Sequence, residues 1–282
     1  MTWYSKYLSV FEKKFDLAPA SVIEEVRQKL KKTECDHPIA SVVVIAHNEE
    51  TRLLSCLWSI SDNICRYPIE VIGVNNNSSD RTADVFESVG VTTFFEEKKS
   101  CGYARRCGLE HARGKYYICI DADTMYPPGY IQTMIDALEK PGVVAVSALW
   151  SFIPDHRHSW LGLKIYEFLR DAHIRLIYIK RPELGVRGMV LAYRAEYGRK
   201  VGYRVRIIRG EDGAMALGLK QYGKIKLITS SKARAVTCSG TLDVEGSLFN
   251  SFQVKAMKAI KGFNKYFTSR TEYKDQESNL IK

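Results

Sequence analysis

From residue 40 onward, short apolar runs alternate with stretches whose apolar residues recur every three or four positions. The runs are rich in β-branched residues and end in polar turns, which is typical of strands, whereas the wider spacing is typical of helices packed on one side. This pattern predicts strands at 40–46, 69–74, 91–95, 116–120 and 143–149, and helices at 53–60, 82–89 and 102–112. The alternation predicts an α/β fold with a mostly parallel central sheet flanked by helices.

Beyond residue 150 the pattern is less regular. One long helical segment, a glycine-containing strand near 188–193 and a basic loop occupy 155–209, where we expect contacts to a variable substrate. A helix at 210–219 and strands at 224–228 and 233–237 follow.

The two ends of the chain are predicted to be helical extensions. Within residues 1–38, Val22, Val26 and Leu30 share one helical face, which can pack on the core or on a partner. From residue 245 a basic amphipathic helix is predicted, which either packs on its own domain or lies on an anionic membrane. Its apolar positions are Phe249, Phe252, Ala256, Ile260, Phe263 and Phe267, opposite Lys255, Lys258, Lys261 and Lys265. The predicted units are thus 1–38, a main domain at 39–240, and a C-terminal helix and tail at 241–282.

Charge and cysteine content narrow the class of protein. The net charge of +10 favours anionic partners, which include nucleic acid, acidic membranes and phosphate-bearing substrates. Five charged residues interrupt the most apolar segment, 161–179, so we expect no membrane-spanning helix, and the first residues lack the unbroken apolar core of a signal peptide. Seven scattered cysteines without a C-x-x-C pair argue against disulfides or a zinc knuckle and favour a cytoplasmic location.

The strongest candidate for chemistry is Asp121-Ala122-Asp123, which follows the predicted strand at 116–120. Ligands of open α/β sheets bind at the carboxyl ends of the strands. Two carboxylates spaced i and i+2 can face one crevice there, and hard divalent cations take carboxylate oxygens as ligands. A cation held in this way neutralises a departing diphosphate. The tripeptide alone is common, so its position after an apolar strand carries the prediction.

Two further polar groups each have a structural and a functional interpretation. The turn at 75–80 is either an Asx-rich turn that caps the next helix or a surface on which Asn75 offers its amide to a base edge. Glu211 and Asp212 stand at the start of the helix at 210–219. Acids there either stabilise the helix dipole or act as a general base toward an acceptor hydroxyl.

In this order, the motifs resemble the inverting glycosyltransferases of family 2 over about residues 38–240. The segment 41–50 is similar to that family's first strand and donor-binding turn, and 75–82 to its second nucleotide-contacting turn. The segments 104–108 and 112–114 resemble its pre-catalytic helix, Asp121-Ala122-Asp123 its metal motif, and Glu211-Asp212 its base. The resemblance implies the Rossmann-like GT-A fold and inverting transfer of a sugar from a nucleoside diphosphate.

The resemblance also implies roles for individual residues. Those implied to bind the donor are Ala46, Asn48 and Glu49 beside the nucleoside, Asn75 at the pyrimidine edge, Arg105 at the base or diphosphate, and Asp121 near the ribose. Asp123 would ligate a Mg or Mn cation, Asp212 would be the catalytic base, and Glu211 would contact the acceptor or support its neighbour. The implied donor is a nucleoside-diphosphate sugar, with UDP-sugar favoured, and the acceptor is a saccharide or a lipid-linked saccharide.

Several positions depart from the family pattern. Ile45 replaces the usual proline, Asn75 stands where aspartate is commoner, and Arg106 replaces a frequent asparagine. The amide oxygen of Asn75 still accepts the uracil imide proton, with less charge assistance. No histidine follows His173, so the metal would rest on Asp123, the diphosphate and water. The Q-x-x-R-W signature of processive synthases is missing, so we expect transfer of single sugars.

Two other functions fit part of the pattern. A sugar nucleotidyltransferase also has an α/β nucleotide-binding fold, but the loop after its first strand is rich in glycine and contains arginine. Here residues 46–50 occupy that place and read AHNEE. A basic nucleic-acid-binding protein fits the net charge, but no RNA-binding or helix-turn-helix motif occurs. We therefore expect a metal-dependent transferase of cell-surface polysaccharide or glycolipid synthesis, without a nucleic-acid partner. We expect any membrane contact to be peripheral, at the inner face.

Overall fold

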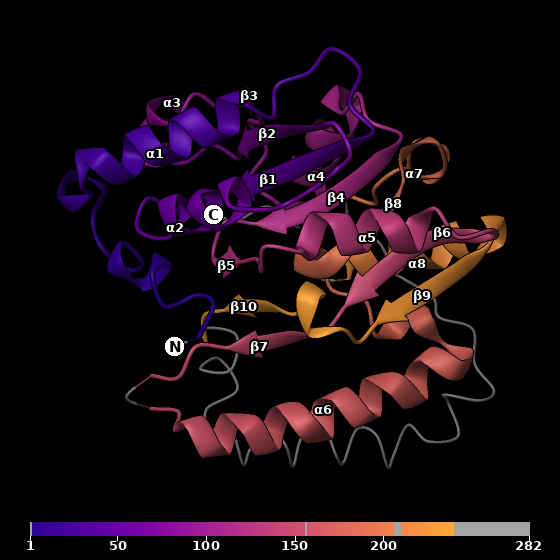
Figure 1. Ribbon diagram of the computed structural model, residues 1–282. Helices are drawn as coiled ribbons and strands as arrows, with labels where there is room; N and C mark the ends of the chain where they lie inside the picture. Colours follow the sequence, from indigo (N-terminus) through magenta and orange to yellow (C-terminus); the bar gives the residue numbers. More distant parts are fainter. Residues whose placement is uncertain (1, 156, 206–209, 240–282) are drawn as a thin grey trace.

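The computed structural model describes residues 2–155, 157–205 and 210–239 (Figure 1). Its centre is a seven-stranded sheet in the order β3-β2-β1-β4-β8-β6-β9. The strands are β1 (Ala40–Ala46), β2 (Ile69–Asn75), β3 (Thr92–Phe95), β4 (Tyr116–Asp121), β6 (Val143–Ala148), β8 (Leu191–Arg194) and β9 (Lys224–Ile228). Only the pairs that involve β8 are antiparallel in this sheet, as the described residues define it. The predicted α/β class with a mostly parallel sheet is confirmed.

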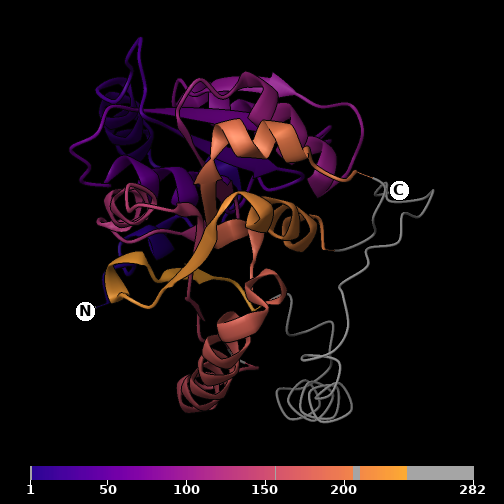
Figure 2. The same ribbon diagram turned by 90° about the vertical axis from the view of Figure 1, so that its right-hand side faces the viewer.

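Helices cover both faces of this sheet (Figure 1, Figure 2). They include α2 (Leu53–Ser61), α3 (Thr82–Ser88), α4 (Cys101–His111), α5 (Tyr130–Leu138), α7 (Ala195–Val201) and α8 (Glu211–Leu219). Along β1, Val42 and Val44 belong to the hydrophobic cluster that contains α2 and α5, whereas Val43 and Ile45 belong to the cluster that contains α4 and α8. Because successive side chains of a strand point to opposite faces, the two helical layers lie on opposite sides.

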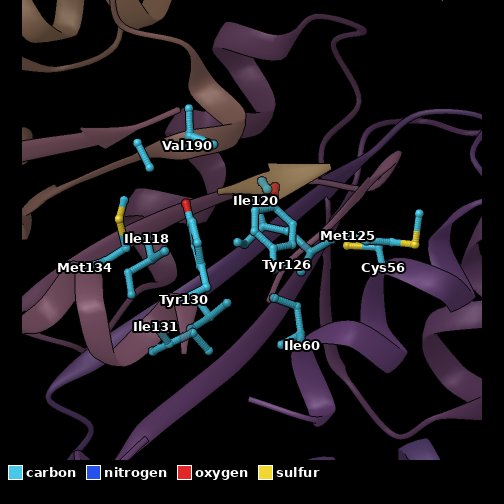
Figure 3. Close-up of a cluster of buried hydrophobic side chains, with 14 of the residues drawn as sticks. Cys56, Ile60, Ile118, Ile120, Met125, Tyr126, Tyr130, Ile131, Met134 and Val190 are labelled. Carbon is cyan, nitrogen blue, oxygen red and sulfur yellow. The ribbon is translucent and has the colours of Figure 1, made fainter. Parts of the chain in front are cut away.

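A cluster of buried side chains fixes the strand that ends at Asp121 (Figure 3). It joins β4 to α2, α5 and the segment after β5 through Cys56, Ile60, Ile118, Ile120, Met125, Tyr126, Tyr130, Ile131, Met134 and Val190. The rings of Tyr126 and Tyr130 are 4.7 Å apart between centroids. Close packing of this kind restricts the movement of the residues that follow β4.

The N-terminal extension packs on the core of its own chain. This is one of the two alternatives that the sequence left open, the other being a partner protein. Two 3-10 turns at Tyr7–Ser9 and Phe15–Leu17 precede α1 (Ala20–Lys31). Val26 and Leu30 are buried in the same cluster as α2. The Trp58 indole N–H donates a hydrogen bond to Glu25 at 3.1 Å. The predicted helical face therefore covers the outside of α2.

A second, three-stranded sheet has the order β5-β10-β7. Its strands are β5 (Thr124–Met125), β7 (Trp150–Phe152) and β10 (Ala235–Thr237). Thr237 pairs with Thr124 in the antiparallel register of β10 and β5, so the last described segment returns to the residues just after Asp123. Strands of two or three residues are too short to show a hydrophobic period, so β5 and β7 were not predicted.

The structure corrects two predicted strands. The strand predicted near 188–193 is a 3-10 turn at Gly188–Val190 followed by β8, because the Val190 N–H bonds back to the Arg187 carbonyl. The strand predicted at 233–237 is only β10, since Ser231–Ala233 form another 3-10 turn. The predicted long helix is α6 (Trp160–Lys180), and none of the described helices is long and apolar enough to span a bilayer. The predicted tail helix lies outside the described residues.

Candidate active site

The carboxyl ends of β1 and β4 open into a cavity of about 260 Å³, bounded on its other side by α4 and α8. Five segments that are distant in sequence contribute its lining. The lining residues are Ile45, Ala46, His47, Glu49, Asn76, Cys101, Ala104, Arg105, Asp121, Ala122, Asp123, Glu211 and Asp212. The cavity lies at the strand edge where ligands of open α/β sheets bind.

Most of the residues singled out from the sequence meet in this cavity. Those that line it are Ala46, Glu49, Arg105, Asp121, Asp123, Glu211 and Asp212. Asn48 and Asn75 do not belong to the lining; Asn48 stands in the turn after β1, and Asn75 is the last residue of β2. The two halves of the predicted chemistry, the metal motif and the proposed base, therefore share one cavity.

Asn48 and Asn75 hold the turns next to the cavity. The amide oxygen of Asn75 accepts the backbone N–H of Ser78 at 3.1 Å, which is the Asx-turn interpretation of this segment. Asn48 adopts a left-handed φ of 55°, a conformation that asparagine tolerates, and accepts the backbone N–H of Ser79 at 2.8 Å. The second bond ties the turn after β1 to the turn after β2.

Among the lining residues that the sequence did not single out as site residues are two polar ones, His47 and Asn76, each next to a predicted residue. The His47 ring nitrogen Nδ1 lies 2.7 Å from the Asn76 carbonyl oxygen. The Asn76 side-chain amide donates to the carbonyl groups of Glu96 at 3.1 Å and Lys98 at 2.7 Å. The polar turn composition was the available signal, but composition does not say which of several adjacent side chains faces the cavity.

Arg105 is the buried cation of the site. It lies on α4, donates to the Ile120 carbonyl at 3.2 Å and forms an ion pair with Asp121. Burial raises the pKa of Asp121 to about 6, and the Asp123 charge adds to this rise, although Arg105 acts in the opposite direction. The guanidinium therefore offsets only part of the negative charge around it.

Asp123 lies between β4 and β5, where short contacts orient its carboxylate. The Thr124 hydroxyl donates to one oxygen at 2.9 Å. The Cys238 thiol, which follows β10, contacts the other oxygen at 3.4 Å. Pairing of β10 with β5 thus brings a residue from the end of the described chain to the predicted metal ligand.

Asp212 stands in the first turn of α8. Gly210 precedes it with a φ of 101°, a left-handed conformation that favours glycine. The buried Oδ1 of Asp212 has no hydrogen-bond partner among the described residues, and the Arg105 Nε lies 4.0 Å from it. Burial raises the pKa of Asp212 to about 7, the Glu211 charge raises it further, and Arg105 lowers it.

Glu49 adds a third carboxyl group with a raised pKa to the cavity. Burial raises its pKa to about 7, with repulsion from Asp123, while Arg52 lowers it. The Arg52 guanidinium lies 3.2 Å from the Glu49 carboxylate. Acids outnumber cations in the lining, and this surplus favours binding of a positive ion.

Gly188 and Tyr126 support the site and were not identified from the sequence. A Cβ atom at Gly188 would lie 2.7 Å from the Arg105 guanidinium and even closer to the Asp212 carboxylate. The Tyr126 hydroxyl accepts the Asp121 N–H at 3.2 Å and donates to the Met189 carbonyl at 2.9 Å. One buried phenol thus connects the metal motif to the 3-10 turn that packs on Asp212.

Solved structures with a similar fold are glycosyltransferases of the GT-A type. The mannosyltransferase PcManGT from Pyrobaculum calidifontis, in complex with GDP-Man and Mn²⁺, superposes with a TM-score of 0.55 at 18% identity, over 83% of this chain and 68% of that one. TarS from S. aureus with UDP-GlcNAc gives 0.52 at 16% identity, over 71% and 58%. Glucosyl-3-phosphoglycerate synthase from Mycobacterium tuberculosis with Mg²⁺ and UDP gives 0.52 at 20% identity, over 85% and 83%. The expected GT-A fold is confirmed.

Curated proteins with similar sequences are glycosyltransferases by name. The 4,4'-diaponeurosporenoate glycosyltransferase of Staphylococcus aureus is 30% identical over 151 residues, which are 50% of this chain and 40% of that protein. The putative glycosyltransferase EpsH of Bacillus subtilis is 32% identical over 103 residues, 35% of this chain and 30% of that protein. The chain thus spans less than half the length of these relatives.

A family-level comparison covers a larger part of the chain. The sequence model described as glycosyl transferase family 2 matches residues 41–201, more than half of the 282 residues. The matched region runs from β1 through the 3-10 turn beside Asp212 to α7. With its GT-A fold and the acidic cavity at the strand edge, the chain belongs to glycosyl transferase family 2.

Proposed function

We propose that this protein is a metal-dependent glycosyltransferase that moves a single sugar from a nucleoside diphosphate, preferably UDP, to an acceptor hydroxyl with inversion. The acceptor is a saccharide or a lipid-linked saccharide of the cell surface. The observation that carries the proposal is that Asp212, with a pKa raised to about 7, lines the same cavity as Asp121 and Asp123. A cytoplasmic location stays a prediction.

In this proposal Asp212 acts as the general base. Its carboxylate takes the proton of the acceptor hydroxyl while that oxygen attacks the anomeric carbon, and the bond to the diphosphate oxygen breaks on the opposite face. A pKa of about 7 is matched to proton transfer at neutral pH. The Oδ1 atom, which has no hydrogen-bond partner in the described part of the chain, leaves a lone pair for that proton. Glu211, its neighbour, is proposed to contact the acceptor or to support the base.

Donor binding is assigned to the two turns and to α4. Ala46, Asn48, Glu49 and Asn75 are proposed to hold the nucleoside. Arg105 is proposed to contact the nucleobase or the diphosphate of the donor. Its charge also lowers the pKa of Asp212, against the effect of burial. Asp121 is proposed to contact the ribose.

The residues present fit a Mg²⁺ or Mn²⁺ ion at Asp123. Repulsion from Asp123 contributes to the raised pKa values of Glu49 and Asp121, and a cation would relieve it. Within residues 2–155, 157–205 and 210–239, no three His, Cys, Asp or Glu side chains form a complete cage. Such a site suits an ion that shares its shell with phosphate and water. When bound, the ion neutralises the charge that develops on the diphosphate.

The solved relatives support a nucleotide-sugar donor. Their complexes contain UDP-GlcNAc in TarS, GDP-Man with Mn²⁺ in the mannosyltransferase, and UDP with Mg²⁺ in the glucosyl-3-phosphoglycerate synthase. Two of these three ligands are uridine nucleotides, which agrees with the UDP preference that the resemblance implies. The family match gives no support to a sugar nucleotidyltransferase or a nucleic-acid-binding protein.

Thermal shift measurements with UDP, GDP and dTDP, each with and without Mn²⁺, test donor binding directly. We expect UDP with Mn²⁺ to raise the melting temperature most, and an oligonucleotide panel to have no effect. Asp123→Ala should remove the Mn²⁺-dependent part of the shift, whereas Asp212→Asn should keep it. A panel of nucleotide sugars then identifies the donor by transfer or slow hydrolysis. Stabilisation by oligonucleotides but by none of the nucleotides would overturn the proposal.

A further inference from the structure

Helix α6 presents its apolar side chains outward. Phe168 is 72% exposed and Leu176 is 67% exposed. Seven of the eleven large apolar side chains exposed in the described part of the protein are on this helix: Trp160, Leu161, Ile165, Phe168, Leu169, Leu176 and Ile179. Residues 161, 165, 168, 172, 176 and 179 follow steps of three and four, so they form one stripe along the helix. A contiguous apolar surface of this kind indicates an interaction site.

The charged side chains on the inner side of α6 fix its rotational setting. Glu167 accepts the backbone N–H of Phe152 at 2.8 Å and the Ser151 hydroxyl at 3.0 Å. Asp171 is buried and forms an ion pair with Arg234 of the segment before β10. Rotation of the helix to bury its stripe would break these buried bonds, which is costly. The outward position of the stripe is therefore built into the fold.

The exposed charges of α6 are all basic. Lys164, Arg175 and Lys180 are exposed, whereas Glu167 and Asp171, the only acids of the helix, are buried. The face therefore combines large apolar side chains with cations. This combination matches a lipid surface with anionic headgroups, and tryptophan at one end of the stripe is typical of the membrane interface. A second copy of the helix would instead bring like charges together.

We propose that α6 is a membrane-binding helix that lies flat on an anionic lipid surface with its stripe among the acyl chains. The helix has 21 residues, so the contact would be about 30 Å long. It runs along one side of the molecule, next to β7 of the three-stranded sheet (Figure 1). The cavity therefore stays accessible to a nucleotide while α6 contacts lipid. The sequence suggested membrane contact only for the tail; this proposal assigns it to a different element.

The tail that follows the described residues is a second candidate for lipid contact, which the sequence predicts independently of α6. Ser239, the last described residue, contacts Asp155, whose carboxylate accepts the His158 N–H at 2.7 Å just before α6 begins. The chain thus leaves the described structure beside the amino end of α6. The basic amphipathic helix that the sequence predicts for the tail would suit the same anionic lipid surface.

Vesicle flotation of the full chain tests the proposal. The wild type should float with phosphatidylcholine vesicles that contain 30% phosphatidylglycerol, and at least fivefold less with phosphatidylcholine alone. The double variant Phe168→Asp, Leu176→Asp should bind the anionic vesicles at least tenfold more weakly. Ile64→Asp, at a side chain that is 77% exposed outside α6, is the matched control and should bind like the wild type. Unchanged circular dichroism and UDP-dependent thermal shifts establish that each variant is folded.

Quenching by brominated lipid gives a second readout that does not depend on acidic substitutions. Trp160 is 62% exposed, Trp3 in the N-terminal extension is half-buried, and Trp58 and Trp150 are buried, so lipid should quench mainly Trp160. Trp160→Phe should lose most of the quenching. Equal flotation of the double variant and the wild type would overturn the proposal, as would a wild type that binds no vesicles. A dimer seen by light scattering in the wild type and lost in the double variant would assign the face to a second copy instead.

Discussion

Asp62 and Asp212 are two aspartates whose side chains are similarly exposed but whose pKa values are shifted in opposite directions. Their side chains are 12% and 17% exposed. Asp62 accepts a hydrogen bond from the Lys29 ammonium at 2.6 Å and one from the Tyr7 hydroxyl at 2.8 Å. It also forms an ion pair with Lys6. Burial acts to raise its pKa, but the bonds from these three partners outweigh burial and hold the pKa below its usual value.

Asp212 has the same kind of burial without such partners. Within the described residues its ion-pair partner is Arg105 at 4.0 Å, its neighbour Glu211 is another acid, and its pKa rises to about 7. The two side chains are similarly exposed, and the partners of Asp62 lower its pKa, whereas burial and the Glu211 charge raise the pKa of Asp212. Asp62 fastens the N-terminal extension to α2, whereas Oδ1 of Asp212 has no hydrogen-bond partner in the described part of the chain and can take a proton.

The largest difference between the two aspartates should appear in activity. Asp212→Asn removes the proposed base and should lower the transfer rate by about 10²–10⁴-fold while donor binding is retained, because general base catalysis contributes a factor of this size. Asp62→Asn is the matched control and should keep transfer near the wild-type rate. Initial rates and calorimetric titration of UDP with Mn²⁺ measure both. A rate for Asp212→Asn within threefold of the wild type would remove the assignment.

Gly188→Ala tests whether the surroundings of Asp212 are set by close packing. The new Cβ would lie 2.7 Å from Arg105 and closer still to the Asp212 carboxylate, so one of them must move. We expect kcat/KM to fall about 10–100-fold, since small displacements of catalytic groups have effects of this size. Gly129→Ala is the control, because its Cβ would meet its nearest neighbour at an ordinary 3.5 Å. Equal activity of both variants would contradict the packing argument.

Asp62→Asn should destabilise the fold. We expect a loss of about 1–3 kcal/mol at pH 7, allowing for the partial exposure of Lys6 and Lys29. Because the folded pKa of Asp62 lies below its unfolded value, its stabilisation is present above the unfolded value of 3.8 and is lost as pH falls through the folded pKa. The difference in unfolding free energy from urea titrations should therefore vanish in strong acid. A difference that persists there would show that the ion pairs are not its source.

The smallest predicted effect has the opposite sign. Because the folded pKa of Asp212 lies above its unfolded value of 3.8, its ionisation opposes folding, and this penalty grows from about pH 4 to about pH 7 and then stays constant. Asp212→Asn should therefore stabilise the protein at pH 8 by about 1–2 kcal/mol, and less at pH 5. Urea titrations at both pH values measure the difference. Destabilisation at pH 8 would mean that the carboxylate has stabilising partners after all.

The donor side of the molecule was predictable because its strands are long and its motifs are local. The apolar runs that became β1, β2 and β4 are six or seven residues long, and each ends at the polar residues that border the cavity. In a parallel sheet the ends of such strands meet at one edge, so the order of motifs was enough to bring Glu49 near Asp121. The individual contacts of Asn48 and Asn75 needed the turn geometry.

The second half was less predictable because its contacts are non-local. Sequence alone does not indicate that β8 enters the sheet antiparallel between β4 and β6, or that Gly188 packs on Asp212, 24 positions later. Which side of α6 faces the solvent could not be predicted from the sequence either. Its buried acids, Glu167 and Asp171, interrupt an apolar segment, and a sequence does not show that their partners come from β7 and from Arg234.

The pH dependence of kcat/KM for the wild type tests the central claim most directly, because it reports the ionisation of the free enzyme. The account predicts a rate that rises about tenfold per pH unit in acid, levels off above about pH 7, and keeps this acid limb in Glu49→Gln, which removes the other carboxyl group with a pKa of about 7. A profile that is flat between pH 5 and pH 8, or an acid limb that disappears with Glu49, would contradict the assignment of Asp212 as the base.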